Sequence, residues 1–121
     1  MEKVVGVGGL FFRAKDPDAL AKWYETHLGV NPAPTDMSTP PWIGEAGVTV
    51  FAPFAADTDY FAEDRAFMVN FRVNDLDTMV EQLKAAGIEI SHEQTMEGVG
   101  RFARIYDPEG NPVELWEPPA G

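Results

Sequence analysis

The stretch "RIYDPEGNPVELWEP", residues 104–118, combines two apolar-rich runs with a turn signal between them. Aspartate, proline, glycine and asparagine close together are typical of a reverse turn, so the flanking runs are predicted to be two strands of one hairpin. Folding this hairpin about Glu109 sets Arg104 opposite Glu114, because both lie equally far from the centre of the turn. A single carboxylate, Glu114, therefore stands among apolar residues on the last predicted strand.

Two halves of the chain repeat one pattern. "GLFFRAKDPDAL" (residues 9–20) matches "MVNFRVNDLDTM" (residues 68–79), with Asp16 and Asp75 in equivalent places. In both copies a β-prone run leads to an aspartate that can cap a helix, and apolar residues then recur at helical spacing until a glycine. The repeat predicts a strand, a helix and three further strands in each half.

These elements define an α+β fold in one domain spanning residues 1–121. We expect the repeated units at about residues 1–53 and 67–118, with a linker at about residues 54–66. The segments "GVTVFAP" and "NPVELWEP" are the predicted closing strands of the two units.

Composition restricts the possible partners. With a net charge of −11, the surface would repel nucleic acid and anionic membranes, although acidic walls can attract a cationic ligand. The sequence has no run of the ~20 apolar residues that span a bilayer. It also has no cysteine, which excludes disulfides and thiol catalysis and fits a cytoplasmic location.

Three segments together resemble the vicinal oxygen chelate superfamily, which includes glyoxalases, extradiol dioxygenases and the bleomycin and fosfomycin resistance proteins. The segments are "DPDALAKWYETHLGV", "FRVNDLDTMVEQLKAAGIEI" and "DPEGNPVELWEP". The resemblance implies two βαβββ units that form an open, cupped mixed β-sheet with the helices outside and the ligand in the cup. It also implies a homodimer, because small proteins of this kind usually pair and open sheets leave edges that need covering.

In the metal-using members of that superfamily, the ligands lie on the first and last strand of each unit. The matching positions here are Gly9, Thr49, Met68 and Glu114, and only Glu114 is a suitable ligand. His27 falls near the end of the first predicted helix, and His92 falls on a predicted edge strand. We therefore expect no metal ion and no other cofactor.

Strand alternation predicts which side chains line the cup. The predicted ligand-binding residues are Phe11, Thr49, Phe51, Asn70, Arg72, Arg104, Glu114 and Trp116. Aromatic walls with a few polar groups are typical of small-molecule pockets, although aromatic residues also fill any half-barrel. Trp42 and Tyr60 lie on predicted loops that could close the mouth of the cup.

Two functions remain open. In the first, the protein is a metal-free module that binds and sequesters a small organic molecule, as the bleomycin resistance proteins do. In the second, it is a glyoxalase-like lyase or another enzyme of the superfamily that uses Glu114, although no residue can be assigned as catalytic. In the metal-free case, a desolvated Glu114 needs positive charge, so we expect it to pair with Arg104 or Arg72.

Overall fold

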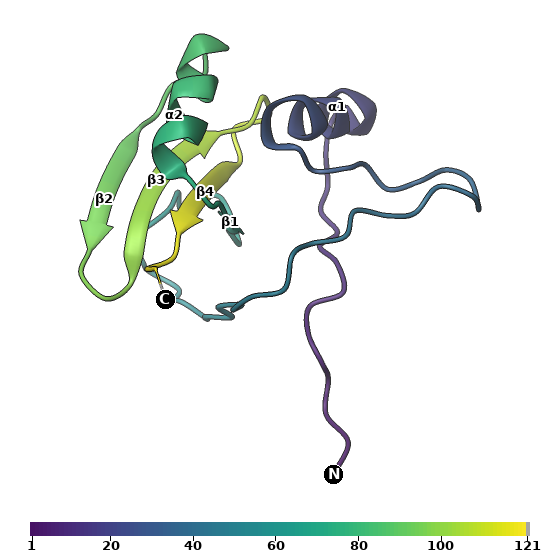
Figure 1. Ribbon diagram of the computed structural model, residues 1–121, viewed down its shortest axis with the longest axis horizontal. Coiled ribbons are helices and arrows are strands. Elements are labelled where there is room, and N and C mark those ends of the chain that lie inside the picture. Colours follow the sequence, from purple (N-terminus) through teal and green to yellow (C-terminus); the bar gives the residue numbers. More distant parts are fainter. Residues whose placement is uncertain (121) are drawn as a thin grey trace.

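The computed structural model describes residues 1–120 and contains two helices and one four-stranded sheet (Figure 1). The elements in chain order are α1 (Pro17–Leu28), β1 (Val69–Arg72), α2 (Leu76–Ala85), β2 (His92–Met96), β3 (Gly100–Tyr106) and β4 (Pro112–Glu117). From β1 onward, this order is the strand, helix and three strands predicted for the second unit.

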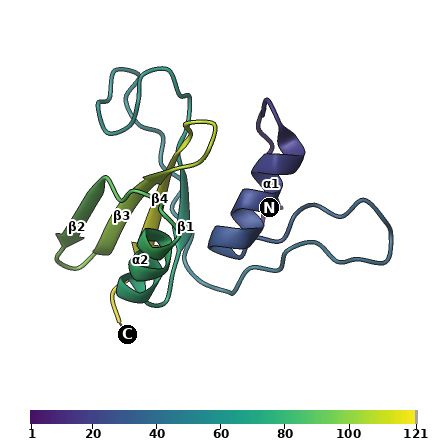
Figure 2. The ribbon, with the colours of Figure 1, turned by 90° about the horizontal axis from the view of Figure 1, so that it is seen from above.

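The sheet has the strand order β1-β4-β3-β2. Strand β1 runs parallel to β4, whereas β3 is antiparallel to both β4 and β2, so the sheet is mixed. Figure 2 shows the open sheet with α2 along one face and α1 beyond the end that carries the β3–β4 turn. The predicted fold class, an α+β protein with an open mixed sheet and two helices outside it, is confirmed.

Helix α2 follows the signals that predicted it. The Asp75 carboxylate accepts a hydrogen bond of 3.1 Å from the Thr78 backbone N–H, which caps the first turn. The buried residues Leu76, Val80 and Leu83 recur at helical spacing and place one apolar stripe against the sheet.

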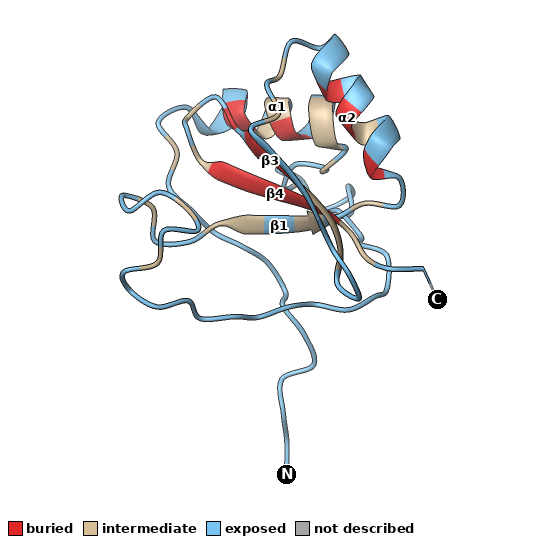
Figure 3. Cartoon of the chain, turned by 90° about the vertical axis from the view of Figure 1, so that its left-hand side faces the viewer, coloured by how far each residue is buried: buried red, intermediate tan, exposed pale blue. Residues whose placement is uncertain are grey.

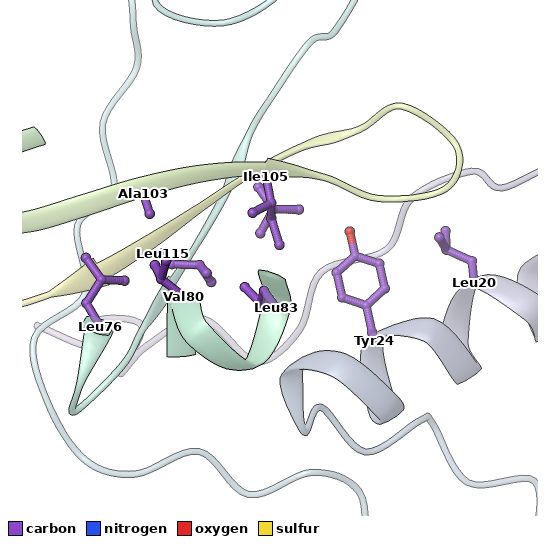
Figure 4. Packing of buried hydrophobic residues seen from close by; sticks show 9 residues of the cluster. Leu20, Tyr24, Leu76, Val80, Leu83, Ala103, Ile105 and Leu115 are labelled. Carbon is purple, nitrogen blue, oxygen red and sulfur yellow. The ribbon is translucent and has the colours of Figure 1, made fainter. Parts of the chain in front are cut away.

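The core lies between the helices and one face of β3 and β4. Figure 3 shows that burial is concentrated in these strands and on the inner sides of the helices. The buried apolar residues of the core are Leu20, Tyr24, Leu76, Val80, Leu83, Ala103, Ile105, Val113 and Leu115. Figure 4 shows the side chains of Leu76, Val80 and Leu83 from α2 packed against the strands, and Tyr24 and Leu20 from α1 at the end of this cluster, so α2 covers the face and α1 closes its end.

The predicted turn between β3 and β4 is present, and the Asp107 side chain organises it. Asp107 is 4% exposed and accepts hydrogen bonds from the backbone N–H groups of Glu109 and Asn111. Gly110 adopts a φ of 80°, a left-handed conformation that favours glycine. The motif therefore closes the hairpin through side-chain acceptors and one glycine.

The same turn also holds helix α1. The Tyr24 hydroxyl donates a hydrogen bond of 2.6 Å to Asp107, and both groups are buried. The Glu109 carboxylate accepts bonds of 2.7 and 3.0 Å from the backbone N–H groups of Lys15 and Asp16, just before α1 begins. Through these contacts the first half of the chain is joined to the second.

The first half contributes its helix, but residues 1–16 and 29–68 contain no strand. The strands expected in "VVGVGGLFFR" and "GVTVFAP" are extended segments without ladder partners, and Figure 1 shows the N-terminal segment leading away from the sheet. The physical reason is that a strand needs a neighbour to satisfy its backbone groups, and no segment of residues 1–68 pairs with another. Within residues 1–120, no helix has the length and apolar character required to cross a lipid bilayer.

Candidate functional site

The sheet register places polar residues in one row across the face opposite α2. Asn70 on β1 pairs with Glu114 on β4, Glu114 pairs with Arg104 on β3, and Arg104 pairs with His92 on β2. Side chains alternate along a strand, so the neighbours of Glu114 in β4 point the other way, into the core. The hairpin register deduced from the turn, with Arg104 opposite Glu114, is therefore present.

Glu114 is the centre of this polar row. Its side chain is buried, with a relative exposure of 7% for the residue. Oε1 accepts a hydrogen bond of 2.8 Å from the Asn70 side-chain amide, and Oε2 accepts one from the Tyr60 hydroxyl. A guanidinium nitrogen of Arg104 lies 4.0 Å from Oε2. Of the two arginines considered as partners, the structure pairs Glu114 with Arg104.

Arg104 is also buried and contacts the residue that covers Glu114. Its Nη2 donates a hydrogen bond of 3.1 Å to the Tyr60 carbonyl oxygen, and its guanidinium carbon lies 5.1 Å from the centre of the Tyr60 ring. Burial, and then the hydrogen bond to Glu114, raise the pKa of the Tyr60 hydroxyl above its usual value. Tyr60 therefore stays a neutral donor to the carboxylate at physiological pH.

A second row, beside the polar one, is largely aromatic. Arg72, Trp116 and Phe102 are register partners on β1, β4 and β3. The rings of Trp116 and Phe102 are stacked, with centroids 6.1 Å apart and planes inclined by 4°. The Trp116 indole N–H donates to the Val99 carbonyl oxygen at 2.9 Å, so the indole has a fixed orientation.

Arg72 turns away from Glu114 and toward the first half. Its guanidinium donates hydrogen bonds to the carbonyl oxygens of Glu45 at 2.8 Å and Ala46 at 3.4 Å. Arg72 thus links the edge strand β1 to the segment that leads to Thr49 and Phe51.

The predicted site residues gather around one broad concavity of about 1950 Å³ between the sheet and the first half. The lining includes seven of the eight predicted residues: Phe11, Thr49, Phe51, Asn70, Arg72, Glu114 and Trp116. Glu114 and Trp116 on β4 are buried, whereas Asn70 and Arg72 on the edge strand β1 are exposed. The side chains from the first half are open to solvent, with Phe11 97% and Phe51 84% exposed. Arg104 is not part of the lining and lies against Tyr60 and Glu114.

Two contributors to this surface were not assigned to the lining from the sequence. Phe102 lies two residues before Arg104 on the same strand, so the alternation rule applied to β3 would have included it. The sequence places Tyr60 on a loop that could close the cup, but no sequence signal relates residue 60 to Glu114, because loops have no fixed register with a sheet.

The residues at the superfamily's metal positions do not fit a divalent cation. Gly9 and Met68 provide no oxygen or nitrogen side-chain ligand, and Thr49 provides only a hydroxyl. His27 lies on α1 against Trp23, with ring centroids 5.3 Å apart, and His92 lies on the edge strand β2. In the part of the chain that the structure describes, no three His, Asp or Glu side chains are grouped as a metal site.

Comparisons with known proteins agree with this architecture. The family model described as Glyoxalase/Bleomycin resistance protein/Dioxygenase superfamily matches residues 6–115. A search of curated proteins finds no match.

Three solved structures are similar over nearly the whole chain, each with a TM-score of 0.63. TnmS3, an antibiotic binding protein from Streptomyces sp. CB03234, is 21% identical, and the alignment covers 98% of this chain and all of that one. A glyoxylase/bleomycin resistance protein/dioxygenase domain from Frankia sp. EAN1pec is 18% identical over 97% of this chain and 100% of its own. A superfamily member from Sphaerobacter thermophilus DSM 20745 is 17% identical over 94% of this chain and 98% of its own. At these identities the likeness shows a shared fold.

Proposed function

This chain belongs to the Glyoxalase/Bleomycin resistance protein/Dioxygenase superfamily, and we propose that it binds and sequesters a small organic molecule in the concavity without a metal ion. The observation that carries the proposal is the hydrogen bonding of the Glu114 carboxylate. Glu114 is the one residue that matches a metal-ligand position of the superfamily. Both of its carboxylate oxygens already accept hydrogen bonds, from Asn70 and from Tyr60.

The donor chemistry around Glu114 supports binding without a metal. A divalent cation in a protein usually has several oxygen or nitrogen side-chain ligands, and Gly9, Thr49 and Met68 offer one hydroxyl among them. In place of a second carboxylate or a histidine, Glu114 has the guanidinium of Arg104 at 4.0 Å. A cation at Glu114 would therefore meet an existing positive charge.

The aromatic row supports a small organic ligand. Trp116 and Phe102 present stacked rings to the concavity, and Asn70 and Arg72 add hydrogen-bond donors on the adjoining edge strand. Apolar walls with a few orienting polar groups are the usual composition of such sites. TnmS3 is an antibiotic binding protein with this fold, so the fold is compatible with this kind of binding.

Catalysis by Glu114 is the alternative, and the geometry favours it less. A general base needs an oxygen free to accept a proton from the substrate. Both oxygens of Glu114 are directed at donors of the protein itself, Asn70 and Tyr60, so in this arrangement neither is directed at a substrate. Under the binding proposal, a bound compound is released chemically unchanged.

A thermal-shift screen of small organic compounds, with elemental analysis of the purified protein, tests the proposal. We expect compounds that raise the melting temperature, far less than one metal ion per chain, and recovery of the intact compound by mass spectrometry. Trp116→Phe should weaken binding by about tenfold because it removes part of the stacking surface. The matched variant Trp23→Phe, on α1 and outside the lining, should bind as the wild type does. Stoichiometric metal held through Glu114, or a chemically altered compound, would overturn the proposal.

A further inference from the structure

The ring of Tyr60 occupies a position in the concavity that is covered at its inner end and open at its outer end. The Arg104 guanidinium lies over the ring, 5.1 Å from its centre, and the Phe54 ring packs beside it with a centroid distance of 5.5 Å. The hydroxyl at the end of the ring donates to Oε2 of Glu114. Together, Arg104, Phe54 and Glu114 form a slot that holds a six-membered ring with a hydroxyl group at its inner end.

The segment that carries Tyr60 is irregular and open to solvent. Residues 53–67 contain no helix or strand, and Tyr60 and Phe54 are 38% and 50% exposed. Glu114 beneath them is 7% exposed, so the slot has a buried polar end and an accessible outer end. Residues 57–64 also carry four carboxylates, which makes the approach of this segment to Glu114 electrostatically costly.

The charges of the slot select against ionic ligands. An anionic group at the inner end would meet the Glu114 carboxylate, and a cationic ring would lie against the Arg104 guanidinium. A neutral aromatic ring satisfies both, because its face attracts the guanidinium and its hydroxyl donates to the carboxylate. The group that fits the slot is therefore a neutral phenol, as in the Tyr60 side chain.

We propose that Tyr60 is an internal occupant of the ligand site, and that the bound compound carries a neutral hydroxylated aromatic ring that replaces the Tyr60 ring in the slot formed by Arg104, Phe54 and Glu114. This inference rests on the proposed function and narrows its ligand to a chemical class. The compound displaces one side chain of an irregular segment, and Glu114 exchanges one phenolic donor for another.

The test uses p-cresol, the free counterpart of the tyrosine side chain, with p-methylanisole as a matched probe that keeps the ring and the oxygen but cannot donate. Tyr60→Ala empties the slot and keeps the side chains of Arg104, Phe54 and Glu114 that form it. We expect calorimetry or NMR titration to show that Tyr60→Ala binds p-cresol about tenfold more tightly than it binds p-methylanisole, the difference made by one hydrogen bond to a charged acceptor. Wild-type protein should bind p-cresol more weakly than Tyr60→Ala, because Tyr60 competes.

Adding Glu114→Gln to Tyr60→Ala should remove the preference for p-cresol, because the charged acceptor is lost while the shape of the slot is kept. Circular dichroism establishes that each variant is folded. In the wild type, saturating p-cresol should also speed tryptic cleavage after Arg65 several-fold, because the residues that follow Tyr60 lose the anchor of its side chain at Glu114. This measurement needs no variant.

Equal binding of p-cresol by wild type and Tyr60→Ala, or an absence of preference over p-methylanisole, would overturn the inference. If the compound screen finds a ligand that lacks a hydroxylated ring and whose affinity is the same in Tyr60→Ala, the proposed function stands and this inference fails. If p-cresol behaves as expected but the protein also binds stoichiometric metal at Glu114, the slot stands and the metal-free function fails.

Discussion

The two halves of the chain carry the same helix signals but differ in how their strands find partners. Asp16 caps α1 and Asp75 caps α2 with the same hydrogen bond, 3.1 Å to the backbone N–H three residues on. Glycines in left-handed conformations then follow both helices, Gly29 with a φ of 72° and Gly87 with a φ of 80°. Helix formation uses neighbours in the sequence, and it succeeds in both halves.

The strands differ because they need partners that are distant in the sequence. In the second half the β3–β4 turn brings β4 beside β3, and β4 in turn supplies a parallel partner for β1. In the first half the corresponding region, residues 29–46, contains four prolines, which cannot donate to a ladder. Asp36 organises a turn there through the backbone N–H groups of Ser38 and Thr39, but the segments on its two sides do not pair. The difference teaches that a repeated helix pattern is sufficient for a helix, whereas a repeated strand pattern and a turn are insufficient where the flanking segments cannot form a ladder.

The largest expected effect concerns assembly, because the first half leaves much apolar surface open. The chain exposes 9423 Å², whereas a folded protein of this mass exposes about 6,450 Å². The excess of about 3,000 Å² per chain, about 6,000 Å² for two chains, is on the scale of the largest obligate interfaces. Residues 4–12 and 46–56 carry no charge, so two acidic chains can meet there with little repulsion. We predict a homodimer through these segments.

Sedimentation analysis should give twice the 13.3 kDa of one chain, and Phe51→Asp should shift the protein to monomer because it places a carboxylate in the apolar contact. The control is Glu93→Asp on the exposed strand β2, which should remain dimeric. A wild-type monomer at micromolar concentration would show that the first half needs no second copy.

The second prediction compares the stability contributed by each half. Leu115 in β4 is 1% exposed, and Leu115→Ala should lower the free energy of unfolding by about 2–5 kcal/mol through lost burial and a cavity. Val50 in the first half is 70% exposed. In the monomeric Phe51→Asp background, Val50→Ala should change the free energy of unfolding by less than about 0.5 kcal/mol. Urea denaturation measures both, and similar losses would mean that residue 50 is packed within its own chain.

The sequence predicted what depends on local signals and on register. Both helices, the 107–111 turn, the pairing of Arg104 with Glu114 and the polar face of β4 all follow from caps, turn residues and alternation. The superfamily was identified from the same segments. The sequence could not predict that the expected strands of the first half would remain unpaired. Periodicity indicates which face of a strand is apolar, but it does not indicate whether a partner strand is present.

The site itself was predicted only in part. Alternation identified Asn70, Glu114 and Trp116 on the sheet, but the contact of Tyr60 with Glu114 depends on a loop path that no pattern encodes. The domain boundaries, the cytoplasmic location and the ligand-binding roles stay predictions.

The third prediction concerns the contact that joins the halves. Tyr24→Phe keeps the buried ring of α1 and removes the hydroxyl that donates to Asp107. We expect the free energy of unfolding to fall by roughly 1.5–3 kcal/mol, the usual value for a hydrogen bond to a charged group. Tyr106→Phe, on an exposed tyrosine of β3, is the matched control and should have little effect. If both variants have the stability of the wild type, the Tyr24 hydroxyl contributes nothing to docking α1.

The smallest effect is a change in how stability depends on alkaline pH. Burial of Tyr24, and then its hydrogen bond to Asp107, raise the pKa of the hydroxyl in the folded chain above the ordinary value of about 10. As pH rises past that ordinary value, the unfolded chain loses the Tyr24 proton first, so the contribution present below about pH 10 is lost above it.

We therefore expect urea denaturation of the wild type to give a free energy of unfolding that falls between about pH 9 and 11, and falls less steeply in Tyr24→Phe. The slope should be reduced without being abolished, because the pKa of Tyr60 is raised in the same direction by burial and by Glu114. Tyr106→Phe should keep the wild-type slope. Identical slopes in Tyr24→Phe and the wild type would mean that Tyr24 ionises equally in folded and unfolded chains. Helix α1 would then not be held at Asp107 in solution, and its N-terminal end would be joined to the β3–β4 turn through Glu109 instead.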